Sequence, residues 1–93
     1  MNFTEEQLKE IENFGAVFFE PGRIAEIMEL DAEYLQKEIE DKTSAVSRAY
    51  RAGMLRSEYE LRVAEIELAK RGSSQAIEGA KKMITSFKIN SIE

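Results

Sequence analysis

The chain has 93 residues, of which 43% are hydrophobic and 33% are charged, and its formal net charge is −5. This length suits one domain with a small core, and the composition is that of a globular chain rather than a disordered one. The absence of cysteine and histidine excludes disulfides, thiolate metal sites and the usual general base near neutral pH. No apolar run is long enough to span a membrane, and no basic, apolar leader is visible, so we expect a cytoplasmic protein.

The first predicted helix begins after Thr4, because Thr4 and Gln7 have the spacing of a capping box. Apolar residues then recur every three or four positions and form one stripe, which contains Leu8, Ile11, Phe14 and Phe18. We expect this helix to end near Phe19 and Glu20, since Pro21 disfavours helical geometry in the residue before it.

Two short helices are predicted next. Pro21 suits the first turn of a helix, and the apolar face of this second helix contains Ile24, Ile27 and Met28. Leu30 is expected in a turn, and Asp31 is a candidate N-cap for a third helix from Ala32 to about Asp41. Its inward-facing residues are Leu35 and Ile39. Ala25 is small and lies where the second and third helices are expected to cross. Two short helices joined by a turn, with a small residue at their crossing, favour a helix-turn-helix.

One long helix is predicted over residues 43–71, because this segment contains no proline and only one glycine, Gly53. Gly72 follows its predicted end. The apolar residues of this helix fall on two arcs, so both sides must be covered, either within its own bundle or by other subunits. The candidate oligomerisation residues on these arcs are Leu55, Tyr59, Leu61 and Leu68. A capping-box pattern over residues 57–60 leaves the alternative that two helices replace one.

Gly72 and Ser73 indicate the end of one helix and the start of another. A last helix is predicted from about Ser74 to Phe87, and the tail over residues 88–93 is expected to fray. The expected fold is therefore all-α. An N-terminal helix-turn-helix three-helix unit (residues 1–42) is followed by a long helix and a short packing helix. These last two helices (residues 43–93) form a probable oligomerisation region within one compact domain.

Catalysis is not expected. Without histidine or cysteine, an enzyme would need paired carboxylates, a lysine or a serine in a pocket, and pairs such as Glu26 and Glu29 are more often a solvated helix face. The chain lacks a glycine-rich phosphate loop. We therefore predict no catalytic residues, no metal site and no cofactor.

Charge is divided unevenly along the chain. Residues 1–42 hold four basic and twelve acidic side chains, a net charge of −8, and residues 43–93 hold nine basic and six acidic ones, a net charge of +3. The acidic total lowers the expected non-specific affinity for nucleic acid, although phosphate contacts depend on local basic patches.

Two segments carry a family resemblance. FTEEQLKEIENFGAVFFEPGRIAEIMELDAEYLQKEIED and the later RAGMLRSEYELRVAEIELAKRGSSQAIEGAKKMI resemble the small terminase subunits of tailed phages and prophages. Gly53 and the closing Ala-x-x-Gly-Ser pattern at residues 69–73 match that family, and a short packing helix follows at residues 75–77. Two departures are Glu29, where a glycine is common, and the acidic character of the third helix.

The resemblance implies a non-enzymatic subunit that recognises double-stranded DNA, forms a ring-like homo-oligomer and passes viral DNA to a large ATPase-nuclease. Its recognition positions map onto Glu33, Tyr34, Gln36, Lys37 and Glu40. Gln36 can read adenine and Lys37 can contact guanine or phosphate, although each is equally consistent with an ordinary polar surface.

Further cations near this face complete the candidate DNA-binding set, namely Arg23 and Lys42. Three alternatives remain: an acidic helical module that binds a basic protein partner, a helix-turn-helix transcriptional regulator, and a small carboxylate enzyme. The contact with DNA is expected to be weak per subunit, because so few cations accompany so many carboxylates.

Overall fold

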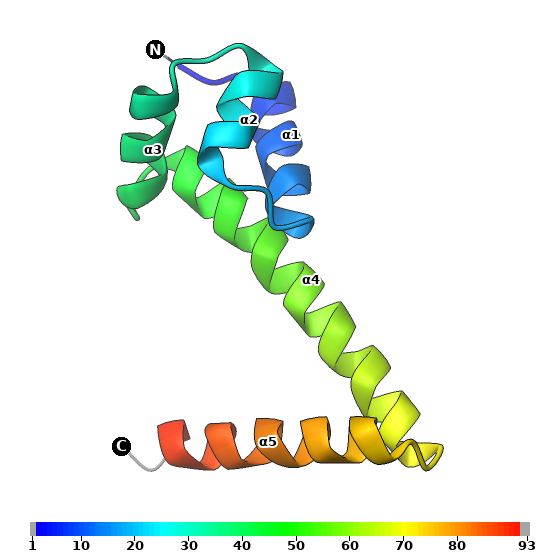
Figure 1. Ribbon diagram of the computed structural model, residues 1–93. Coiled ribbons are helices and arrows are strands. Elements are labelled where there is room, and N and C mark those ends of the chain that lie inside the picture. The colour runs from blue at the N-terminus through cyan, green and yellow to red at the C-terminus, as the bar shows by residue number, and fades with distance from the viewer. Residues whose placement is uncertain (1, 92–93) are drawn as a thin grey trace. The chain divides into compact units, whose positions relative to one another are not determined.

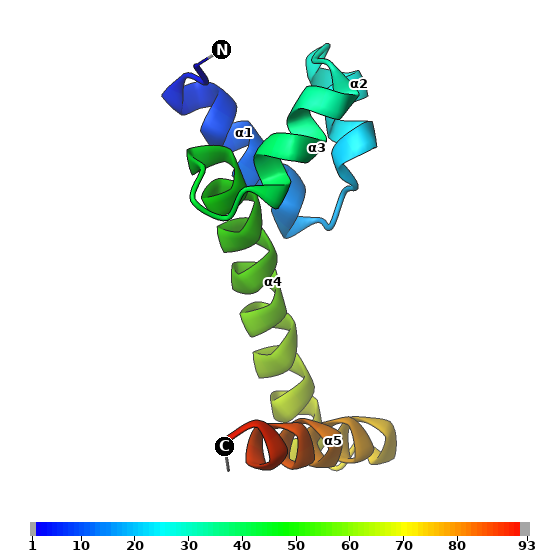
Figure 2. The same cartoon turned by 90° about the vertical axis from the view of Figure 1, so that its left-hand side faces the viewer.

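The computed structural model describes residues 2–91, with side chains through Lys88, and every regular element in that range is an α-helix. The helices are α1 (Glu5–Ala16), α2 (Pro21–Met28), α3 (Ala32–Glu40), α4 (Ala45–Lys70) and α5 (Ser74–Ser91) (Figures 1 and 2). The predicted all-α class is confirmed. The long helix α4 is continuous through Gly53, so two helices do not replace it.

The chain divides into two compact units, Met1–Glu58 and Tyr59–Glu93, and the division falls within α4. This boundary lies beyond residue 42, because the first half of α4 packs with α1, α2 and α3. Each of these four helices contributes to one buried cluster, which contains Ile11, Ile24, Ala25, Leu35 and Val46. Burying each of the larger apolar side chains stabilises the fold by roughly 1.5–3 kcal/mol.

Helix α1 ends at Ala16, which is earlier than the predicted end near Phe19. Phe18 takes a left-handed conformation with φ 59°, and this reverses the chain before Pro21. The Phe18 and Phe19 amides donate to the carbonyls of Gly15 and Phe14, as in a Schellman motif, and the rings of Phe14 and Phe19 stack at 5.7 Å. The end of α1 is therefore set by a local turn and not by the proline.

Helices α2 and α4 end with the same hydrogen bonds. At the end of α2, Glu29 has φ 55° and Leu30 donates to the carbonyl of Ala25; at the end of α4, Gly72 has φ 97° and Ser73 donates to that of Leu68. Glycine adopts this conformation freely, whereas other residues do so at a cost of about 1–2 kcal/mol. Glu29 thus takes the left-handed conformation at the position where the resembling family often has a glycine.

Helices α1 and α4 approach each other closely at two glycines. A Cβ atom on Gly15 would lie 2.2 Å from the carbonyl oxygen of Tyr50, and one on Gly53 would lie 1.9 Å from that of Glu12. Any larger residue at either position would therefore separate the backbones. Gly53 serves this helix contact and does not break α4.

Polar side chains of α4 secure the end of α1 and the loop after it. The Ser57 hydroxyl donates to the Ala16 carbonyl, which no longer has a partner within its own helix. The Tyr50 hydroxyl donates to the Phe19 carbonyl at 2.6 Å. Burial, and to a smaller extent the Glu20 carboxylate, raise the pKa of Tyr50, so its hydroxyl keeps the proton that it donates.

Ser73 links the last two helices in the second unit. Its amide takes part in the turn that ends α4, and its hydroxyl accepts a hydrogen bond from the Ala76 amide, as expected for the N-cap of α5. Helix α5 continues to Ser91, so the predicted helix end at Phe87 is wrong by four residues. Residues 92 and 93 lie outside the described range.

Candidate nucleic-acid interface

Helix α3 carries the candidate recognition residues, and its start is fixed by Asp31. The Asp31 carboxylate accepts a hydrogen bond of 2.9 Å from the Tyr34 amide, which confirms Asp31 as the N-cap. Leu35 is completely buried and Ile39 packs against the same core, so both face inward as predicted. The opposite side of α3 is left exposed.

The exposed stripe of α3 contains four polar residues at helical spacing, namely Glu33, Gln36, Lys37 and Glu40. The Gln36 amide nitrogen donates to a carboxylate oxygen of Glu40 at 3.0 Å, so this amide is already engaged. Two carboxylates thus accompany the single amine of Lys37. The stripe keeps the helical spacing of the candidate recognition positions, but its net charge is negative, which disfavours binding to a polyanion.

Tyr34 lies apart from this stripe. Its side chain is half-buried, and its ring stacks on Phe3 with centroids 6.2 Å apart and planes 9° from parallel. This contact attaches the segment before α1 to α3. The structure therefore gives Tyr34 a packing contact, which the spacing of the recognition positions did not indicate.

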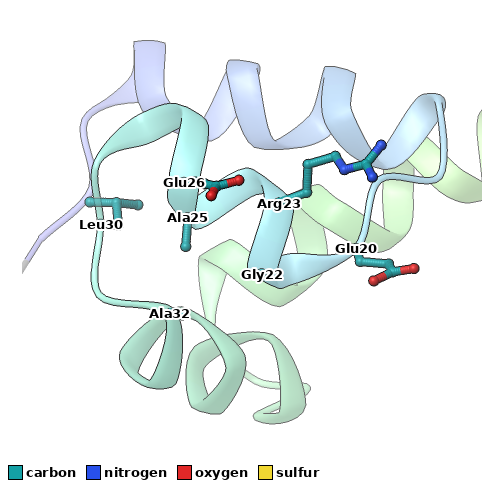
Figure 3. Close-up of a pocket in the computed structure, with 7 residues that line it drawn as sticks. All are labelled: Glu20, Gly22, Arg23, Ala25, Glu26, Leu30 and Ala32. Atoms are coloured by element: carbon teal, nitrogen blue, oxygen red, sulfur yellow. The ribbon is translucent and has the colours of Figure 1, made fainter.

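Arg23 lies on α2 beside a shallow pocket between α2 and the start of α3 (Figure 3). Its guanidinium carbon is 5.5 Å from the centre of the Phe19 ring, a cation–π contact that leaves the side chain exposed. The other residues that line this pocket are Glu20, Gly22, Ala25, Glu26, Leu30 and Ala32. One cation and two carboxylates are unsuited to holding a phosphate.

Lys42 follows α3 in a turn that is held by Asp41. The Asp41 carboxylate accepts hydrogen bonds from the Thr43 hydroxyl at 2.6 Å and from the Thr43 amide at 3.0 Å. These bonds, from the side chain and then from the backbone, lower the pKa of Asp41. Arg51 donates to the Lys42 carbonyl at 3.0 Å, and the Lys42 side chain is exposed.

The candidate oligomerisation residues are all exposed on α4. The exposed fractions are 63% for Leu55, 69% for Tyr59, 62% for Leu61 and 50% for Leu68. Leu61 and Leu68 also line a shallow pocket with residues at the start of α5. These four apolar side chains of α4 therefore keep half or more of their surface exposed.

Other exposed residues were missed by the sequence pattern. Ile27 was expected on the inner face of α2, but it is 52% exposed, because Ile24 and Met28 occupy the core side. Lys81, Lys82 and Lys88 on α5 are also exposed, and they were not among the predicted DNA-binding residues. The net positive charge of residues 70–91 could have pointed to these lysines, whereas no spacing pattern marks them.

No group of acidic side chains within residues 2–91 is arranged to hold a metal ion. In the same range, no helix is both long and apolar enough to cross a membrane. Comparison of the chain with models of protein families, with curated proteins and with solved structures finds no match.

Proposed function

We propose that the chain is a non-catalytic DNA-binding subunit that acts as a homo-oligomer, similar to a phage terminase small subunit. In this proposal α2 and α3 form a helix-turn-helix, and the exposed stripe of α3 faces the major groove. By the same resemblance, the oligomer would pass DNA to a large ATPase-nuclease.

The α2–α3 unit is the observation that supports this proposal. Two short helices pack together across a three-residue connection, the small Ala25 is buried at 2% exposure where they meet, and Glu29 provides the left-handed turn. The second helix then presents a stripe at the spacing of groove-reading residues.

Electrostatics limits the affinity of each subunit. Arg23, Lys37 and Lys42 are the cations of the proposed face, and each phosphate that a cation neutralises adds only about one unit to the salt slope of binding. Useful affinity then requires several subunits on one duplex, because linked sites raise the effective concentration. The exposed apolar arcs of α4 would join these subunits.

A titration of labelled duplex near about 50 mM salt tests the proposal, since weak electrostatic binding is strongest at low salt. Lys37→Ala is expected to weaken binding more than Lys9→Ala, which removes an exposed lysine of α1 paired with Glu12. No binding by the wild type at tens of micromolar would contradict DNA recognition.

A second candidate function follows from the negative stripe itself. The Glu33 and Glu40 carboxylates flank Lys37 on α3, and residues 1–42 carry a net charge of −8. Such a surface suits a basic protein partner. Binding to a basic peptide that Glu33→Gln and Glu40→Gln together weaken, without any binding to duplex, would favour this function instead.

A further inference from the structure

The chain carries three successive zones of different charge. Residues 1–42 have a net charge of −8, residues 43–69 balance four arginines against four glutamates, and residues 70–93 hold five basic side chains and two acidic ones, a net charge of +3. The proposed helix-turn-helix lies in the most acidic zone. The cations that a polyanion requires are concentrated at the other end of the described chain.

At helical spacing, the apolar and polar residues of α5 fall on opposite sides of the helix. The apolar side begins with the buried Ala76 and ends with Ile84 and Phe87, which are 54% and 71% exposed. The polar side is exposed along its whole described length and contains Ser74, Gln75, Glu78, Lys81, Lys82, Thr85 and Lys88. Lysines are thus interleaved with hydroxyl and amide groups.

The single acidic residue of this surface leaves most of its positive charge unbalanced. Lys81 lies 3.8 Å from Glu78 in a pair whose side chains are both 69% exposed, and such exposed pairs contribute little binding energy. The Thr85 hydroxyl donates its one hydrogen to the Lys81 carbonyl at 3.0 Å, so the donors left for phosphate on this side are the lysines, Ser74 and Gln75. Lys82 and Lys88 are exposed on either side of this polar strip.

We infer that the polar side of α5 is a second DNA-binding surface, which contacts the phosphate backbone of the duplex independently of its sequence. Lysine, serine, threonine and glutamine side chains are the usual donors to phosphate oxygens, and they position a protein on DNA without reading bases. The inference rests on the proposed DNA-binding function, and it assigns most of the non-specific affinity to α5 rather than to α3.

The test compares two charge-matched double variants by fluorescence anisotropy of a labelled duplex over a range of salt concentrations. Lys82→Gln/Lys88→Gln removes two cations from α5, and Lys9→Gln/Arg48→Gln removes two exposed cations from α1 and α4. Glutamine keeps a high helix propensity, so both variants are expected to fold. The α5 variant should reduce the salt slope of binding by about two units and should lower the affinity at low salt by about tenfold or more. The control variant should leave the slope unchanged.

Equal effects of the two double variants would overturn the inference. If Lys37→Ala still weakened binding in that case, the proposed function would stand without a contribution from α5. A wild type that failed to bind duplex would overturn both. The inference would also be wrong if the α5 variant changed only the oligomeric state, or if wild type bound vesicles rich in phosphatidylserine but not duplex.

Discussion

At the scale of single residues, two side chains occupy a backbone conformation that favours glycine. Phe18 and Glu29 both have φ between 50° and 60°, whereas the equivalent position after α4 is Gly72. The Phe18 ring is half-exposed and follows the exposed Val17, so its replacement would change the surface as well as the backbone. Glu29 is exposed and forms no part of the core, so its backbone cost can be measured alone.

Glu29→Gly is expected to raise the thermal midpoint. Removing the Cβ relieves a cost of about 1 kcal/mol, which exceeds the entropy lost with glycine at a left-handed position. Because a net change of about 1 kcal/mol corresponds to roughly 4–8 °C in a domain of this size, the smaller net gain should raise the midpoint by less than that. Glu26→Gly is the matched control, because it places the same glycine three residues earlier within α2 and should lower the midpoint. A lower midpoint for Glu29→Gly as well would contradict the expected strain.

Two serines near the start of α4 are predicted to respond in opposite ways to alanine. The Ser44 hydroxyl accepts from the Ser47 amide at 3.0 Å and donates to the Glu38 carbonyl at 2.6 Å, so it caps α4. Ser47 is completely buried, and its hydroxyl makes no hydrogen bond within the described residues. Unmade hydrogen bonds of this kind cost about 1–3 kcal/mol.

Ser47→Ala should therefore raise the urea midpoint by an amount equivalent to about 1 kcal/mol, with an unchanged m-value. Ser44→Ala should lower it by about 1–2 kcal/mol through the lost cap. A destabilised Ser47→Ala protein would indicate that a buried water satisfies the hydroxyl.

The sequence predicted the helix-capping residues well, but it did not predict the left-handed turn at Phe18 or the contact of Tyr34 with Phe3. Thr4 and Asp31 cap their helices as expected, because capping depends on side-chain chemistry within three or four residues. The turn at Phe18 could not be predicted, since an aromatic residue rarely adopts positive φ. The hydrogen bonds of the Phe18 and Phe19 amides and the packing of Phe14 on Phe19 become visible only in the structure. The contact of Tyr34 with Phe3 likewise depends on tertiary structure.

At the scale of helices, the contact between α1 and α4 depends on small residues. Gly15 and Gly53 meet backbone atoms of the opposite helix, which cannot move aside as a flexible side chain can. Arg56 on α4 also forms an ion pair with Glu12 on α1. The contact therefore combines close backbone approach with one charged pair at its edge.

Gly53→Ala is expected to destabilise the first unit by about 1–3 kcal/mol or more, because the new Cβ would force α1 and α4 apart. Gly22→Ala is the control: no atom lies within 4 Å of a Cβ at that position in α2, so this variant should be neutral or slightly more stable. Denaturant midpoints measure both. A stable Gly53→Ala protein would contradict the close contact.

Helix-scale features were mostly predictable, and the limits have a physical cause. Hydrophobic periodicity and capping residues predicted the bounds of α2 and α3 and the start of α5 to within about one residue, since these signals are local. The purpose of Gly53 was not predictable, because a glycine that breaks a helix and one that admits a neighbour look alike in sequence. Helical spacing was enough to predict the candidate recognition stripe. The hydrogen bond from Gln36 to Glu40 within that stripe could be seen only in the structure.

At the scale of the whole molecule, the exposed apolar residues of α4 and α5 require an explanation. Leu61 and Leu68 lie seven residues apart on one face of α4, and Leu55 and Tyr59 lie four apart on the other arc. Large exposed apolar patches on small proteins normally mark an interface. Self-association would bury these residues, and it would also link the proposed weak DNA contacts of separate subunits into one assembly.

We therefore expect the wild type to be oligomeric and Leu61→Lys or Leu68→Lys to lower its oligomeric state, because a lysine in a buried apolar contact must lose its hydration. Glu60→Lys is the control, since it places the same side chain on the charged flank of the helix one residue away. Light scattering with size-exclusion chromatography gives the subunit number, and far-ultraviolet circular dichroism shows whether each variant remains helical. A monomeric variant that keeps its helices should also lose most of its affinity for duplex, whereas Glu60→Lys should not. A wild type that remains a strict monomer at high micromolar concentration would rule out self-association through α4 and leave its apolar arcs for a different partner.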